Sequence, residues 1–208
     1  MKNLMGTLMT LLDIACGRPI PLTDAGRARR IELMIVALLA SLVFAAGWGA
    51  AAGSRNAMLA TANLYKVPMV VLLSCVFAAP AGLVAWRLSG ATMRGTDLAL
   101  GFVGSVFGGT LVLAVLAPLV ALYYHSSAWA GPMLGVGSAF VALGSGTIMF
   151  FRGIAKRLPA GASKMSAFVP ALVILGMQLA TLLQLASVVS PIFPERTPFS
   201  GGIDHFGH

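Results

Sequence analysis

Five long stretches of this sequence carry no Asp, Glu, Lys or Arg, and this feature restricts the fold more than any other. They run over residues 33–53, 67–86, 98–124, 131–151 and 165–191. A helix needs about 20 mostly apolar residues to cross roughly 30 Å of bilayer hydrocarbon, and each stretch is long enough. The pattern predicts an all-α membrane protein, a bundle of five transmembrane helices.

The composition excludes the main alternatives. Charged residues make up 10% of the chain and hydrophobic residues 58%, whereas about a quarter of the residues in a soluble domain are charged. Disordered chains are also poor in aliphatic residues, so disorder is excluded. Two cysteines are too few for a disulfide scaffold or a cysteine-rich metal fold.

The basic residues predict the orientation of the five spans. Eleven of the fourteen Lys and Arg residues lie before the first span, between the second and third, or between the fourth and fifth. The cytoplasmic side holds such an excess. We therefore expect a cytoplasmic segment over 1–30, a transmembrane domain over 31–191, and an extended non-cytoplasmic arm over 192–208.

Residues 2–15 are predicted to form an amphipathic helix along the cytoplasmic membrane surface, because apolar residues recur at helical spacing. These are Leu4, Met5, Leu8, Leu11, Leu12 and Ala15. A docking surface for a partner helix is the alternative. A cleaved signal peptide is rejected, since Asp13 occupies a position that needs an aliphatic residue and cleavage would export the basic cluster at 27–30.

Two further segments are expected outside the bilayer core. Residues 54–66 are too polar to span, so we expect a short interfacial helix that ends before Pro68. The terminal arm alternates Pro and Gly with aromatic residues, which is typical of extended chain. Its rings either dip into the interface or contact a neighbouring subunit; they are Phe193, Phe199 and Phe206.

Small residues spaced four apart recur in the spans, and such pairs let helix backbones approach closely. The pairs are Gly49 with Gly53, Gly104 with Gly108, Ser105 with Gly109, and Gly131 with Gly135. The spacing is equally consistent with packing inside one chain and with contact to another chain.

The fifth span contains three polar side chains, Gln178, Thr181 and Gln184. They indicate interhelical hydrogen bonds or, alternatively, a pathway for a polar solute. Prolines at 80, 118 and 170 lie within spans and are expected to bend them.

The residues that carry chemistry are few, and we expect no catalytic, cofactor or metal site. Asp204, His205 and His208 lie together only at the chain end. Cys75 is expected in the middle of a span and Cys16 in the cytoplasm, so the two cysteines cannot meet. Nucleic acid is not an expected partner, because the positive-inside rule accounts for most of the basic residues. Those residues also attract anionic lipids on the cytoplasmic face.

Three motifs resemble a family of small bacterial five-span membrane proteins, often labelled as actin-binding WH2-domain-containing. They are Lys66-Val67-Pro68 with Pro80 and the 87–94 turn, the run 112–118 with Tyr123-Tyr124, and 184–186 followed by 191–193 and Pro198-Phe199. The family's usual Trp and Arg are replaced here by Ser187 and Ser190. The topology is also similar to that of Yip1-type membrane-organising proteins.

This resemblance implies a multi-pass protein of the bacterial inner membrane and carries no catalytic residues. The spans carry no Asp, Glu, Lys or Arg but several small-residue pairs. From these two features we predict a non-enzymatic subunit that anchors or scaffolds a multi-protein membrane complex, with protein partners or further copies of itself. The alternative is a protein for the permeation or transport of small solutes or ions.

Overall fold

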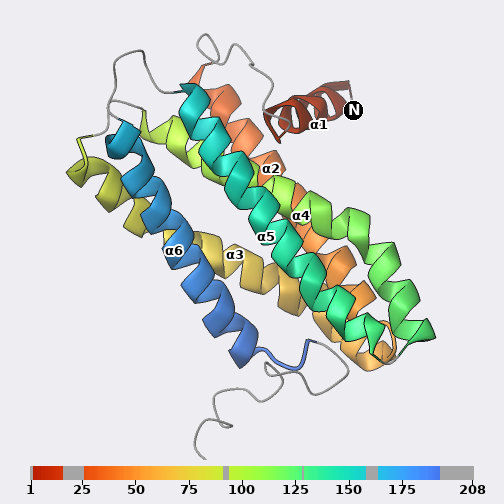
Figure 1. Ribbon diagram of the computed structural model, residues 1–208. Coiled ribbons are helices and arrows are strands. Elements are labelled where there is room, and N and C mark those ends of the chain that lie inside the picture. The colour runs from red at the N-terminus through yellow and green to blue at the C-terminus, as the bar shows by residue number, and fades with distance from the viewer. Residues whose placement is uncertain (1, 16–25, 91–93, 128, 158–163, 193–208) are drawn as a thin grey trace, which may run out of the picture.

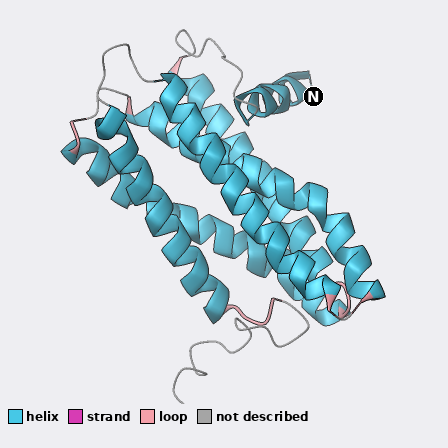
Figure 2. Ribbon diagram, viewed as in Figure 1, coloured by secondary structure: helices cyan, strands magenta, loops and turns pink. Residues whose placement is uncertain are grey.

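The computed structural model describes residues 2–15, 26–90, 94–127, 129–157 and 164–192, and over these residues it contains helices and no strand (Figures 1 and 2). Five helices are long and apolar enough to cross a membrane, which confirms the predicted all-α membrane fold. The helices are α1 (Lys2–Ala15), α2 (Arg27–Ala52), α3 (Ala57–Leu88), α4 (Gly95–Ser126), α5 (Ala130–Arg157) and α6 (Lys164–Val188).

The prediction of a separate interfacial helix over 54–66 is wrong, because α3 runs without a break from Ala57 to Leu88. The Asn56 side chain begins it by accepting hydrogen bonds from the backbone N–H groups of Met58 and Leu59, at 3.0 and 3.3 Å. Pro68 and Pro80 both lie inside the continuous helix. At 1.5 Å per residue, 32 residues extend about 48 Å, so α3 is longer than the hydrocarbon core is thick.

The helices are arranged around α2, which packs against both α3 and α4. On one side α5 packs against α4, and on the other α6 packs against α3, while α5 and α6 touch little. Figure 1 shows α1 at the edge of the bundle, near the end where α2 begins. The fifth span is therefore attached to the rest mainly through α3.

Three apolar clusters form the interior. The first joins α3, α4, α5 and α6 around Phe102, Phe150 and Ile174. The second joins α2, α3, α4 and α5 around Trp48 and Tyr124, at the opposite end of the bundle from the first. The third joins α1, α2 and α4 around Leu11 and Phe107.

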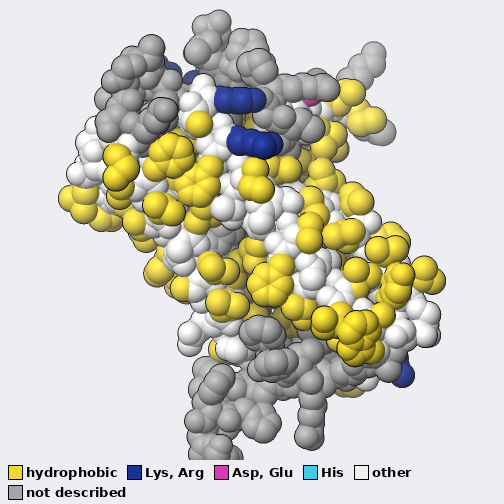
Figure 3. All heavy atoms as spheres, viewed as in Figure 1, with side chains coloured by type: hydrophobic (Ala, Val, Ile, Leu, Met, Phe, Trp, Pro, Cys, Tyr) yellow, Lys and Arg dark blue, Asp and Glu magenta, His cyan; other side chains and the backbone are white. Residues whose placement is uncertain are grey.

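Apolar side chains also cover most of the outside, as lipid-facing helices require. Figure 3 shows them over the middle of the visible face, with Lys and Arg near its two ends. Arg87 lies in the last turn of α3 and Arg152 near the end of α5, whereas Arg55 lies in the turn between α2 and α3, at the opposite end. This distribution is what the five-span topology predicts.

Candidate functional site

The amphipathic helix α1 is tied to the start of α2 by a polar network. The Arg29 guanidinium lies 2.6 Å from a Glu32 carboxylate oxygen and donates to the Thr7 hydroxyl at 3.1 Å. The same hydroxyl lies 3.4 Å from Glu32. Thr7 is 1% exposed, so these groups fix one side of α1 against α2.

The next residue along α2 makes the corresponding link to α4. Arg30 forms an ion pair with Asp97 at 2.8 Å and donates to the Thr96 hydroxyl at 3.3 Å. Arg30 is 6% exposed, so this contact is far better shielded from water than the Arg29–Glu32 pair. Two neighbouring arginines thus join three helices at one end of the bundle.

Apolar contacts complete the docking of α1. Leu11 is fully buried beside Leu33, Leu100 and Phe107. A methyl group added at Gly104 would lie 3.4 Å from the side chain of Ile14. This is an ordinary van der Waals distance, so α1 passes close to the surface of α4 at Gly104.

The opposite side of α1 presents three exposed apolar side chains, which we call the α1 stripe. Met5, Met9 and Leu12 are 68%, 64% and 41% exposed, and their spacing of four and three residues places them on one helix face. The sequence indicated one apolar face here. The structure divides that face between a docked half and an exposed half.

The small-residue pairs make contacts within this chain. A Cβ atom at Gly49 would lie 2.6 Å from the Asn63 carbonyl oxygen, so α2 and α3 are in backbone contact there. A Cβ at Gly53 would lie 2.7 Å from the Ala60 nitrogen, and one at Gly131 would lie 2.9 Å from the Tyr124 Cα. The other predicted members, Gly108 and Gly135, are buried.

Another close approach of α4 to α5 involves a glycine that the sequence analysis did not select. A Cβ at Gly146 would lie 3.0 Å from the Ser105 carbonyl oxygen, and one at Gly109 would lie 3.0 Å from that of Ala142. The two glycine Cα atoms face each other across the contact. Gly146 lies two residues from Gly144, whose added Cβ would meet nothing within 4 Å. Glycine spacing alone does not distinguish these two environments.

The three polar side chains of the fifth span do not converge. The Gln178 amide lies 3.9 Å from the Cys75 sulfur of α3. The Thr181 hydroxyl donates to the backbone carbonyls of Met177 and Gln178, at 2.8 and 3.0 Å, and Gln184 is exposed. This arrangement gives one weak interhelical contact, one bond within α6 and one outward-facing amide.

Two buried polar contacts escaped the sequence analysis. The Trp48 indole N–H donates to the Ser138 hydroxyl at 2.9 Å, which joins α2 to α5. The Asn63 amide, which is 0% exposed, donates to the Ile192 carbonyl oxygen at 2.6 Å. Their residues are 90 and 129 positions apart, so no local pattern reports them.

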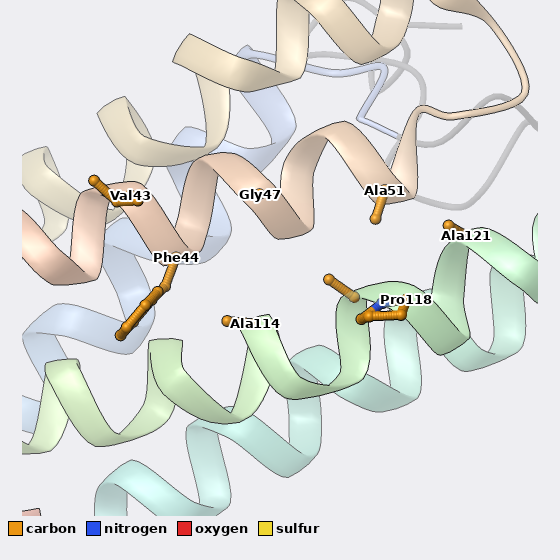
Figure 4. Close-up of a pocket in the computed structure, with 8 residues that line it drawn as sticks. Val43, Phe44, Gly47, Ala51, Ala114, Pro118 and Ala121 are labelled. Atoms are coloured by element: carbon orange, nitrogen blue, oxygen red, sulfur yellow. The ribbon is translucent and has the colours of Figure 1, made fainter. Parts of the chain in front are cut away.

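An apolar groove of about 330 Å³ separates part of α2 from α4. In Figure 4, Phe44 extends from α2 toward α4 at one end, whereas Gly47 contributes no side chain to the gap. The lining residues are Val43, Phe44, Gly47, Ala51, Ala114, Ala117, Pro118 and Ala121. Small residues on both helices leave this space open.

Other predicted residues fall outside the part of the chain that the structure describes. These are the arm residues Phe193, Phe199 and Phe206, the terminal Asp204, His205 and His208, and Cys16. Among the described residues, no group of three or more His, Cys, Asp or Glu side chains is placed to hold a metal ion.

Comparisons of this chain with protein-family models, curated proteins and solved structures find no match. The likeness to the bacterial five-span family therefore stays a prediction from its motifs.

Proposed function

We propose that this chain is a non-enzymatic integral membrane subunit, which anchors or scaffolds a multi-protein assembly in a bacterial inner membrane. The proposal rests on how α1 is held, with one side packed on the bundle and the other side exposed. One side of this helix is held on the bundle through Thr7 and Leu11, and the α1 stripe on its other side is exposed. A helix held in this way presents a preformed surface to a partner.

The physical advantage of such a helix is its low ordering cost. An isolated helix of 14 residues is only marginally stable in water, so a free N-terminal segment would lose conformational entropy on binding. Docking on α2 and α4 removes that cost beforehand, and preorganisation of this kind raises affinity. Methionine side chains adapt to irregular apolar partners, which suits Met5 and Met9 to contact with another protein.

The predicted topology supports the same function. With the N-terminus in the cytoplasm, as the distribution of Lys and Arg indicates, α1 lies at the cytoplasmic surface of the bundle. The partner is then a cytoplasmic protein, or the cytoplasmic part of another membrane subunit, with an apolar patch that covers the stripe. The bundle serves as the membrane anchor of the complex.

Gentle purification from native membranes tests this function. We expect the full chain to elute with a stoichiometric protein partner, at a mass above that of the detergent-bound chain alone. The double variant Met9→Gln/Leu12→Gln should lose that partner, because it makes the stripe polar without altering the docked side of α1.

Met58→Gln is the matched control, since Met58 is 85% exposed and begins α3 at the opposite end of the bundle. It should keep the partner. A chain that elutes alone, or a partner that remains with the double variant, would contradict the proposal. In the second case the stripe contacts lipid.

A further inference from the structure

We propose that the groove between α2 and α4 is a phospholipid site, which holds one acyl chain along its length and the lipid phosphate against Arg55 and His125. The proposal rests on the size of the groove, its lining, and the position of the two basic residues.

The groove has room for a hydrocarbon chain. Its free space is about 330 Å³, which is the size of a small ligand pocket. A chain of methylene groups is thin and flexible, so it can lie along this space between the two helices.

The lining supplies apolar contact along the whole length. Ala114, Pro118 and Ala121 face it from α4, while Gly47 and Ala51 face it from α2. The Phe44 ring packs against Phe107 with its centroid 5.8 Å away, so it is braced where it closes one end of the groove (Figure 4). A Cβ at Gly47 would meet no atom within 4 Å, and a chain in the groove would occupy that open space.

The helical register places a basic residue at the other end. His125 follows Ala114, Pro118 and Ala121 at intervals of four, three and four residues, so all four lie along one face of α4. Arg55 lies in the turn directly after α2, at the same end of the bundle. Both residues are exposed.

The chemistry of these two side chains complements a phosphate. The guanidinium of arginine offers two parallel N–H donors to phosphate oxygens, and an imidazole N–H donates in either charge state. Each lies four residues beyond a groove-lining alanine, Ala51 or Ala121. A headgroup would lie at this end when the lipid tail extends toward Phe44. The arrangement recognises the phosphate and one tail together.

Lipid retention measured by native mass spectrometry tests the site. The full-length protein is delipidated in detergent and titrated with dioleoylphosphatidylglycerol or, separately, with dioleoylglycerol, which lacks the phosphate. Gly47→Leu fills the groove from α2, and Ala117→Leu fills it from α4. Gly144→Leu is the control, since Gly144 is also an exposed helical glycine with nothing near its Cβ position.

We expect Gly47→Leu and Ala117→Leu to lower the affinity for the tightest-bound lipid at least about tenfold. Gly144→Leu should bind lipid as the wild type does. Arg55→Gln/His125→Gln should weaken the binding of phosphatidylglycerol about fivefold and leave the binding of dioleoylglycerol unchanged. Lys66→Gln removes another cation toward the same end of the bundle and should change the binding of neither lipid.

Three results would overturn the proposal. Equal lipid retention by Gly47→Leu, Ala117→Leu and Gly144→Leu excludes the groove. Equal effects of Arg55→Gln/His125→Gln on the two lipids exclude phosphate recognition. A lower oligomeric mass for Gly47→Leu with unchanged lipid binding means that a second copy of the chain, through its side chains, occupies the groove instead.

Discussion

Arg30 and Asp97 form an ion pair of 2.8 Å between the first turns of α2 and α4, although they are 67 residues apart. Arg30 is nearly fully buried, while the Asp97 side chain keeps 23% of its surface exposed. Because only the Arg30 side of the pair is shielded from water, removing its partner should cost more than in a surface pair and less than in a fully buried pair.

Asp97→Asn is expected to lower the free energy of unfolding by about 2 kcal/mol, because it leaves the buried Arg30 charge without its carboxylate. Reversible unfolding of the purified protein in mixed micelles measures the change. Glu32→Gln, which removes the exposed partner of Arg29, should cost about 1 kcal/mol or less. Equal losses for the two variants would show that burial does not strengthen the Arg30 contact.

Gly146→Leu should destabilise the bundle by about 1–3 kcal/mol, since it forces a side chain against the Ser105 carbonyl oxygen where α4 and α5 touch. Gly144→Leu, two residues away on the open side of α5, should have little effect. Thermal unfolding in detergent compares the two. Similar melting temperatures would mean that α4 and α5 do not rely on this backbone contact.

Asn63→Leu should release the segment that follows α6, because it removes the hydrogen bond to the Ile192 carbonyl oxygen. We expect limited proteolysis to cut the chain near Ile192 about tenfold faster, as the loss of roughly 1.4 kcal/mol would allow. The matched control is Thr61→Val, whose hydroxyl bonds only to the Ala57 carbonyl within α3. Cleavage at the same rate in both variants would show that Asn63 does not hold this segment.

Gln178→Leu should leave vesicle permeability unchanged, because the three polar groups of α6 have separate partners and surroundings. Flux of small polar solutes and ions into reconstituted vesicles measures this, with protein-free vesicles as the baseline. A flux that is present in the wild type and lost in Gln178→Leu would favour the permeation hypothesis over the scaffold.

The orientation of the bundle can be tested with single cysteines placed at its two ends in a chain whose own cysteines are replaced by serine. An impermeant maleimide added outside intact cells should label Arg55→Cys and not Arg152→Cys, since both side chains are exposed at opposite ends. The reverse pattern would place the N-terminus outside the cytoplasm and invert the predicted topology.

Most of the fold could be predicted from the sequence, because lipid imposes a simple rule. A span must be long, apolar and helical, and 33–53 and 98–124 satisfied that rule visibly. The start of α3 was missed for a physical reason. The polar residues at 54–66 were interpreted as a separate helix in the interface, but α3 is longer than the hydrocarbon core is thick, and Asn56 caps it. Pro68 then lies within one continuous helix.

The candidate site was predicted only in part. The apolar face of residues 2–15 was visible from its periodicity, yet its division between Leu11, which is buried, and Met9, which is exposed, depends on where α2 and α4 lie. The partners of Trp48 and Asn63 are equally remote in sequence. Tyr124, near the end of α4, is only 1% exposed, because Gly131 allows the start of α5 to pack against it.

The contact between Trp48 and Ser138 has a consequence for biosynthesis. The ribosome makes the indole donor 90 residues before its acceptor, an interval of about 5–18 s at ordinary elongation rates. Throughout that delay the indole N–H of the nascent α2 lacks the Ser138 hydroxyl to which it later donates. Insertion of the fourth span, α5, supplies that hydroxyl. We therefore expect the insertion machinery to shield α2 from lipid until α5 has been made.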